Sequence, residues 1–150
     1  MLPACLLLVC GLTQPNPTLV GRGFDAAAAD PAPGILKVTR HPLMWGFGLW
    51  AIGHLAANGE LAALILFGGV GFLALHGTMR LDAKRRARDP EGFARFAAAT
   101  SNPPLGAILD GRQRLGAALA GIGWARLGGA ALLYAALVLA HPYFAGRALG

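Results

Sequence analysis

Four histidines are the residues of this chain whose chemistry could matter most: His41, His54, His76 and His141. A neutral imidazole is the commonest protein ligand of a transition metal, and its charge changes near neutral pH. Arg40 directly precedes His41, so a permanent cation lies beside one of the four. Which histidines meet, and therefore what they can bind, depends on the elements that carry them.

The composition is that of an integral membrane protein. Of the 150 residues, 55% are hydrophobic and 13% are charged, whereas an ordinary soluble domain has about 25% charged residues. The length predicts one domain, residues 1–150. The net charge is +6, but the basic residues border apolar runs, so we predict no nucleic-acid partner. Cys5 and Cys10 fall on different faces of a helix, so no disulfide between them is expected.

A helix is predicted to begin directly after His41. Pro42 suits the first turn of a helix, where its missing N–H has no intrahelical partner. Residues 43–57 carry no charge, and the Asn-Gly pair at 58–59 indicates a stop. The arginine–histidine pair is therefore expected at one membrane interface, with His54 about 20 Å further along the helix axis.

Three further apolar runs complete the predicted bundle. Residues 1–12 are too short to span about 30 Å of hydrocarbon, so we predict the end of a transmembrane helix whose start is missing. Residues 61–79 form the clearest span, antiparallel to the preceding helix. Three glycines there would let a neighbouring helix approach closely: Gly68, Gly69 and Gly71. Residues 115–140 are interrupted by Arg126, so this span must also use residues 117–124, and Arg126 must snorkel or pair.

Short interfacial helices are predicted between the last two spans. Asp89 is the expected N-cap of one helix, with Phe93 and Phe96 on one side at helical spacing. Residues 105–114 form a second short amphipathic piece. The predicted fold is therefore all-α, an integral membrane helical bundle of about four transmembrane segments with the first one truncated.

The distribution of lysine and arginine predicts the orientation of the bundle. Residues 80–114 hold eight of the 13 Lys and Arg residues, and the loop of residues 13–40 holds three more. A hairpin topology places these two loops on the same side of the membrane. Because cytoplasmic loops carry an excess of Lys and Arg, loops 13–40 and 80–114 are predicted to be cytoplasmic.

This topology sorts the histidines into two levels. His41 and His76 fall near the cytoplasmic ends of adjacent helices, and His54 and His141 fall near the outer ends. Two imidazoles that face each other between helices can hold a haem iron axially. His41 is the favoured ligand because a helix N-terminus disfavours the charged imidazolium. Zinc is less expected, since no cysteine or carboxylate completes a tetrahedral set. The alternative is that an interfacial histidine only hydrogen-bonds a carbonyl or a headgroup.

Several segments together resemble the NnrU family of bacterial membrane proteins. They are residues 39–46 (TRHPLMWG), 53–59 (GHLAANG), 76–77 (HG) with the basic tail that follows, 13–18 (TQPNPT), Thr100 and Ser101 with Pro103 and Pro104, 111–112 (GR) and 141–142 (HP). The resemblance covers nearly the whole chain. That family is similar to the plant 15-cis-zeta-carotene isomerase, a haem b membrane enzyme. NnrU itself is associated with denitrification, where it is linked to the production of active nitrite and nitric oxide reductases.

The resemblance implies a haem-linked role at the bacterial cytoplasmic (inner) membrane, with haem b as the cofactor. His41 is the iron ligand that the resemblance implies, and we predict His76 as the second ligand with Arg40 beside them. The expected partners are the lipid bilayer and either a hydrophobic polyene substrate or the respiratory nitrogen-oxide reductase machinery. The plant enzyme has a cysteine near its Arg-His-Pro segment, where this chain has Val38 and Thr39, so no thiolate switch is expected.

Two alternative functions stay open, and with them the question whether the protein is an enzyme. An Arg-His-Pro sequence that opens a membrane helix also resembles isoprenylcysteine and phospholipid methyltransferases. Those proteins usually carry two adjacent glutamates shortly after the next helix, whereas residues 80–86 hold only Asp82. The other alternative is a non-catalytic membrane assembly factor, which would bind no cofactor.

Overall fold

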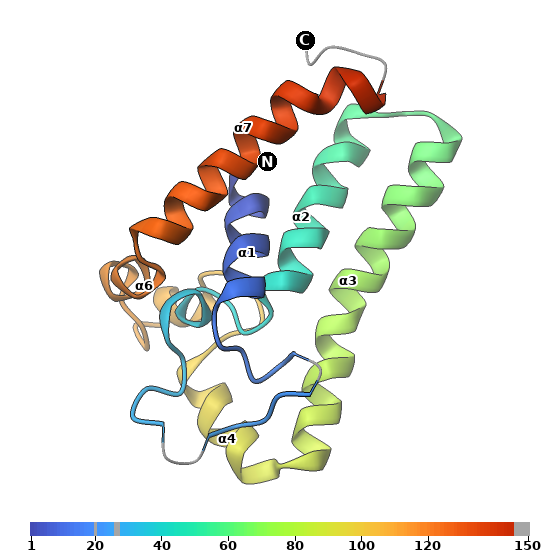
Figure 1. Ribbon diagram of the computed structural model, residues 1–150. Coiled ribbons are helices and arrows are strands. Elements are labelled where there is room, and N and C mark those ends of the chain that lie inside the picture. Colours follow the sequence, from blue (N-terminus) through green and yellow to red (C-terminus); the bar gives the residue numbers. More distant parts are fainter. Residues whose placement is uncertain (20, 26–27, 146–150) are drawn as a thin grey trace.

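The computed structural model describes residues 1–19, 21–25 and 28–145, and every regular element in that part of the chain is helical (Figure 1). The elements are α1 (Leu2–Thr13), the 3-10 helix η1 (Gly34–Lys37), α2 (Pro42–Ala57), α3 (Leu61–Arg88), α4 (Pro90–Ala99), α5 (Gly106–Leu109), α6 (Leu115–Ile122) and α7 (Trp124–Ala145). The all-α prediction is confirmed.

Two helices, α3 and α7, are long and apolar enough to cross a membrane. They contain 28 and 22 residues. Large apolar side chains on both face outward, and Leu73 and Leu139, for example, are 70% and 75% exposed. Helices α1 and α2 are shorter, with 12 and 16 residues. Length and composition therefore support two of the four predicted spans.

The four longest helices pack side by side. In Figure 1, α1 lies between α7 and α2, and α2 lies between α1 and α3. Glycines allow the close approach of α2 to α3, as predicted, but the positions differ. A Cβ on Gly48 would lie 2.8 Å from Leu75 Cδ2, and one on Gly71 would lie 3.4 Å from Ala51 Cβ. A Cβ on Gly68 or Gly69 would meet no described atom within 4 Å other than those of its own helix turn. The prediction was therefore right for Gly71 and wrong for Gly68 and Gly69.

The last apolar run is divided into two helices. Gly123 has φ +79°, a conformation that glycine adopts without steric cost, and it separates α6 from α7. Helix α6 packs against η1 instead of extending the span. The prediction that the span uses residues 117–124 was therefore wrong for residues 117–122 and right for Trp124, the first residue of α7. Arg126 does pair, as predicted. Its Nε lies 3.1 Å from Thr13 Oγ1, and its Nη1 lies 3.0 Å from the Ile122 carbonyl.

The segment between α1 and η1 packs onto the basic end of α3 and onto α4. The buried Arg85 of α3 donates to the backbone carbonyls of Arg22 and Leu19. Phe96 of α4 is 1% exposed, with its ring centroid 5.4 Å from that of Phe24. The apolar side of α4 therefore packs against this loop, and the position of α4 at the membrane interface stays a prediction. The predicted N-cap is confirmed, because Asp89 accepts a 2.8 Å hydrogen bond from the Gly92 N–H.

Candidate functional site

A buried ion-paired cluster joins α2 to α3. His41 is the N-cap residue of α2, and Asp82 lies on α3. His41 Nε2 is 2.8 Å from Asp82 Oδ1, and Arg40 Nη1 is 3.0 Å from Asp82 Oδ2. The His41 side chain is fully buried, and those of Arg40 and Asp82 are 11% and 16% exposed. One carboxylate therefore holds both members of the arginine–histidine pair.

The carboxylate determines which nitrogen of His41 carries the proton. An ionised carboxylate only accepts hydrogen bonds, so Nε2 is the donor to Asp82. In a neutral ring the other nitrogen, Nδ1, then has a lone pair. Nδ1 is buried and has no hydrogen-bond partner among the described residues. The site thus presents an oriented imidazole whose lone pair is available to a metal ion or a proton.

Arg40 pairs with the carboxylate and anchors it to the segment after α4. Burial lowers the pKa of Arg40, and the charge of Asp82 opposes this change. Because the ordinary pKa of an arginine lies far above neutral pH, Arg40 stays cationic there. Its Nη2 donates to the Thr100 carbonyl at 3.2 Å, and its backbone N–H donates to the Ser101 carbonyl at 2.9 Å. The guanidinium carbon also lies 5.6 Å from the centroid of the Phe93 ring.

Asn102 links the three segments that build the site. Its backbone carbonyl accepts a 2.7 Å hydrogen bond from Thr39 Oγ1, and its side-chain oxygen accepts one of 3.2 Å from Trp45 Nε1. Its side-chain nitrogen donates to Thr78 Oγ1 on α3 at 3.0 Å. These bonds fix the start of α2 against α3 and hold the imidazole in place.

The structure does not bring the predicted ligand His76 into this cluster. His76 is exposed, and its ring stacks on Phe72 with centroids 5.3 Å apart and an interplanar angle of 4°. His41 is buried and faces Asp82. Asp82 lies on a different side of α3 from His76, because residues six positions apart on a helix point about 120° apart around its axis. The outer histidines do meet, since the ring centroids of His54 and His141 are 6.4 Å apart.

Three residues of the site were not predicted: Asp82, Asn102 and Thr78. Asp82 carried a usable signal, since it is the only acid between residues 80 and 88, a segment with five Lys and Arg residues. A lone carboxylate on a long basic helix needs a partner if it is buried. Thr78 lies four positions before it, on the same face. Asn102 carried no comparable signal.

The cluster fits a haem iron only in part. Metal-bound histidines usually donate their second ring nitrogen to a carboxylate or a carbonyl, and the unpartnered Nδ1 of His41 matches that pattern. The exposed His76 does not fit as the opposite ligand. The described residues also contain no group of three or more His, Cys, Asp or Glu side chains that could hold a metal ion. The chain therefore supplies one suitable imidazole here and not the predicted pair.

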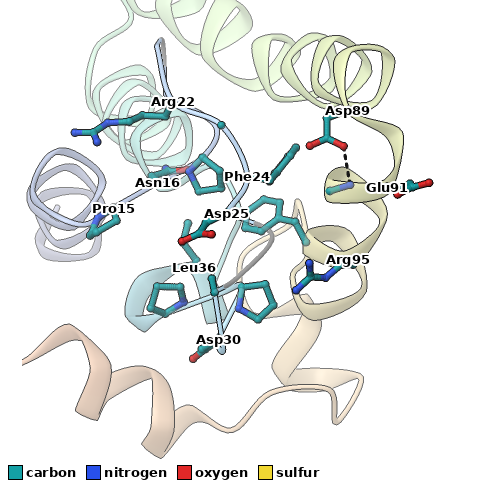
Figure 2. A pocket seen from close by; sticks show the side chains of 17 residues that line it. Pro15, Asn16, Arg22, Phe24, Asp25, Asp30, Leu36, Asp89, Glu91 and Arg95 are labelled. Carbon is teal, nitrogen blue, oxygen red and sulfur yellow. Dashed lines mark hydrogen bonds between the residues drawn. The ribbon is translucent and has the colours of Figure 1, made fainter.

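A separate cavity of about 370 Å³ lies between α4 and the loop that precedes η1 (Figure 2). Phe24, Leu36 and Phe96 give it apolar walls, and neither Arg40 nor His41 lines it. Charged side chains of both signs surround it: Arg22, Asp25, Asp30, Asp89, Glu91 and Arg95. This mixture of charges does not favour one class of ligand.

Comparison with known proteins identifies the family. Residues 1–148 match the family described as NnrU protein. The chain is 35% identical over 82 residues to "15-cis-zeta-carotene isomerase, chloroplastic" of Zea mays, and 34% identical over 84 residues to the protein of that name in Arabidopsis thaliana. These alignments cover 55% of this chain and 22% of each relative, so the chain matches about a fifth of their length. No solved structure matches. With nearly every residue inside the family match, the chain belongs to the NnrU protein family.

Proposed function

We propose that this protein is an isomerase-like membrane protein that acts on a hydrophobic polyene, with His41 at its functional centre. The two relatives are named for isomerising 15-cis-zeta-carotene, which is a polyene. The observation that carries the proposal is the state of His41, whose Nε2 is held 2.8 Å from Asp82 while Nδ1 is buried without a partner. An imidazole prepared in this way is suited to bind a reactive group in a dry site.

The cofactor in this proposal is haem b, with His41 Nδ1 as one iron ligand. A bound haem would supply a metal centre that can act as a Lewis acid towards a double bond. The protein's own contribution is to orient and protect the ligand. Asp82 keeps the proton on Nε2, Arg40 holds the other carboxylate oxygen of Asp82, and the buried surroundings exclude water from Nδ1. His76 has no part in this site.

The proposed location is the bacterial inner membrane, with four spans and with loops 13–40 and 80–114 in the cytoplasm. The outward-facing apolar side chains of α3 and α7 support a lipid surrounding. Figure 1 places α4 and the loop before η1 at the same end of α3, the end that holds its basic residues. Both charge-rich segments therefore lie on one side, as the excess of Lys and Arg in cytoplasmic loops requires.

Absorption spectra of the purified full chain, oxidised and dithionite-reduced, test the haem proposal. We expect a Soret band that is lost in His41→Ala and shifted in Asp82→Asn, because the latter changes the proton held on Nε2. The exposed His76→Ala is the matched control and should leave the band unchanged. A band that survives His41→Ala, or a folded protein without any band, would contradict the proposal. Isomerisation of added 15-cis-zeta-carotene, followed by chromatography, tests the activity separately.

Two other functions remain predictions from sequence resemblance. A role in producing nitrite and nitric oxide reductases, with that machinery as partner, has no supporting contact in the described residues. The methyltransferase alternative needs a free acidic pair after α2 and α3, whereas Asp82 is engaged by Arg40 and His41. Binding of S-adenosylmethionine by a haem-free protein would favour that alternative.

A further inference from the structure

We propose that His54 and His141 form a second site, for a divalent transition-metal ion such as Cu²⁺, at the opposite end of the bundle from His41. His54 lies in the last turn of α2, and His141 lies four residues before the end of α7. Figure 1 shows the end of α7 close to the turn between α2 and α3. Their ring centroids are 6.4 Å apart, with an interplanar angle of 32°. Two imidazoles from distant parts of the chain are thus brought together.

The ring of His54 is prepared as a metal ligand. Its Nδ1 lies 2.8 Å from the Trp50 carbonyl oxygen. A carbonyl only accepts hydrogen bonds, so Nδ1 carries the proton and Nε2 carries the lone pair. Histidine ligands commonly use their second nitrogen in this way, which fixes both the tautomer and the orientation.

Aromatic side chains hold the His54 ring in this orientation. The ring stacks on Phe67 with centroids 4.6 Å apart and an interplanar angle of 27°. The Trp50 ring lies on the same helix at a centroid distance of 4.7 Å. With the ring fixed by two neighbours and one hydrogen bond, little rotamer freedom remains to be lost when an ion binds.

The separation of the rings suits one ion between them. A metal–nitrogen bond of about 2.0 Å and a ring radius of about 1 Å place two imidazoles on opposite sides of one ion with centroids about 6 Å apart. The observed 6.4 Å between His54 and His141 is close to that value. The distance between the two rings therefore leaves room for one ion between them.

The ligand set indicates the class of ion. Imidazole nitrogen suits copper, zinc and nickel, whereas magnesium and calcium prefer oxygen ligands. No third His, Cys, Asp or Glu joins the pair in the part of the chain that the structure describes. The ion would therefore keep open positions for water or another ligand, which is the pattern of an exchangeable site and not of a closed structural one. Cu²⁺ is the sharpest probe because it binds such ligands most tightly.

Electron paramagnetic resonance of the full chain with Cu²⁺, without a polyhistidine tag, tests this site. We expect one equivalent of Cu²⁺ with splitting from two nitrogen ligands. His54→Ala and His141→Ala should each weaken binding at least tenfold and leave splitting from one nitrogen. His76→Ala, which removes an exposed histidine elsewhere on the surface, should change neither. The proposal is overturned if both site variants bind as tightly as the wild type, or if the wild type shows no two-nitrogen signal. The two residues lie on different helices, so the two variants are independent tests. If only one of them folds, its affinity for Cu²⁺ still tests the site.

Discussion

Asp82 is the residue on which the candidate site depends most. Each of its two oxygens accepts a hydrogen bond from a different side chain: Oδ1 from His41 and Oδ2 from Arg40. Neither partner forms an ion pair with another carboxylate in the described part of the chain. Removal of this one charge would therefore leave a mostly buried guanidinium unpaired and an imidazole without orientation, and each change has a measurable consequence.

We predict that Asp82→Asn destabilises the protein by about 3 kcal/mol, the usual cost of leaving one partner of a buried ion pair uncompensated. The amide keeps the size of the side chain but has one acceptor oxygen where the carboxylate has two. The free energy of unfolding in detergent, followed by circular dichroism, measures the effect. Glu91→Gln is a matched control, because Glu91 is exposed. Equal stabilities of the two variants would show that the ion pair contributes nothing.

The pairing of His41 with Asp82 could not be predicted from the sequence for a specific reason. The position of the arginine–histidine pair at the start of α2 could be predicted, because Pro42 marks a helix start. The partner of His41 depends on the rotation of α3 about its own axis. The apolar part of α3 has hydrophobic residues on all sides, so its pattern does not indicate which face meets α2. The predicted partner, His76, and the observed partner, Asp82, lie on different faces of α3, and only the rotation of this helix decides which one meets His41.

The ends of the helices were more predictable than their interruptions. The start of α4 could be predicted because Asp89 and Pro90 have local side-chain chemistry that suits a helix N-terminus. The break at Gly123 could not, since glycines are frequent throughout this chain and nothing local distinguishes this one. The break depends on a tertiary contact, in which α6 leaves the bundle axis to pack on η1.

Gln14 holds the three elements at that contact together. Its Nε2 donates to the Gly121 carbonyl of α6 at 2.9 Å, and its Oε1 accepts from the Ile35 N–H of η1 at 2.9 Å. We predict that Gln14→Ala costs about 2 kcal/mol, because it leaves a buried donor and acceptor without partners. Gln113→Ala is the matched control. It removes a glutamine with a single bond to the Ala99 carbonyl, so its effect on the thermal unfolding midpoint should be smaller.

A reversed order of the two glutamine variants would contradict this account of α6. It would mean that apolar packing of α6 on η1 is sufficient without the side-chain bridge. The close contact of Gly34 with Gly121, where a Cβ on Gly121 would lie 2.8 Å from Gly34 Cα, would then be the main constraint.

At the scale of the whole molecule, the proposed topology and the length of α3 together put the candidate site at the membrane surface. A helix rises 1.5 Å per residue, so residues 61–79 extend about 28 Å, close to the thickness of the hydrocarbon layer of about 30 Å. Asp82 lies less than one turn further on, at the beginning of the basic end. The proposed polyene would therefore approach His41 from the apolar layer, while Arg40 and Asp82 remain at the polar boundary.

This placement predicts which loops a membrane-impermeant thiol reagent can reach. The natural Cys5 and Cys10 are buried, at 4% and 0% exposed, so the wild type should label weakly and serves as the control. Gly59→Cys, in the turn between α2 and α3, should label in intact cells, because the proposed topology puts that turn on the outer side. Glu91→Cys, at the start of α4, should label only after the membrane is permeabilised, since the proposed topology puts the Lys- and Arg-rich end of the bundle in the cytoplasm. The opposite labelling pattern would show that the bundle is inverted, with His41 and Asp82 on the outer side. Labelling of both variants in intact cells would show that the α2–α3 hairpin does not cross the membrane.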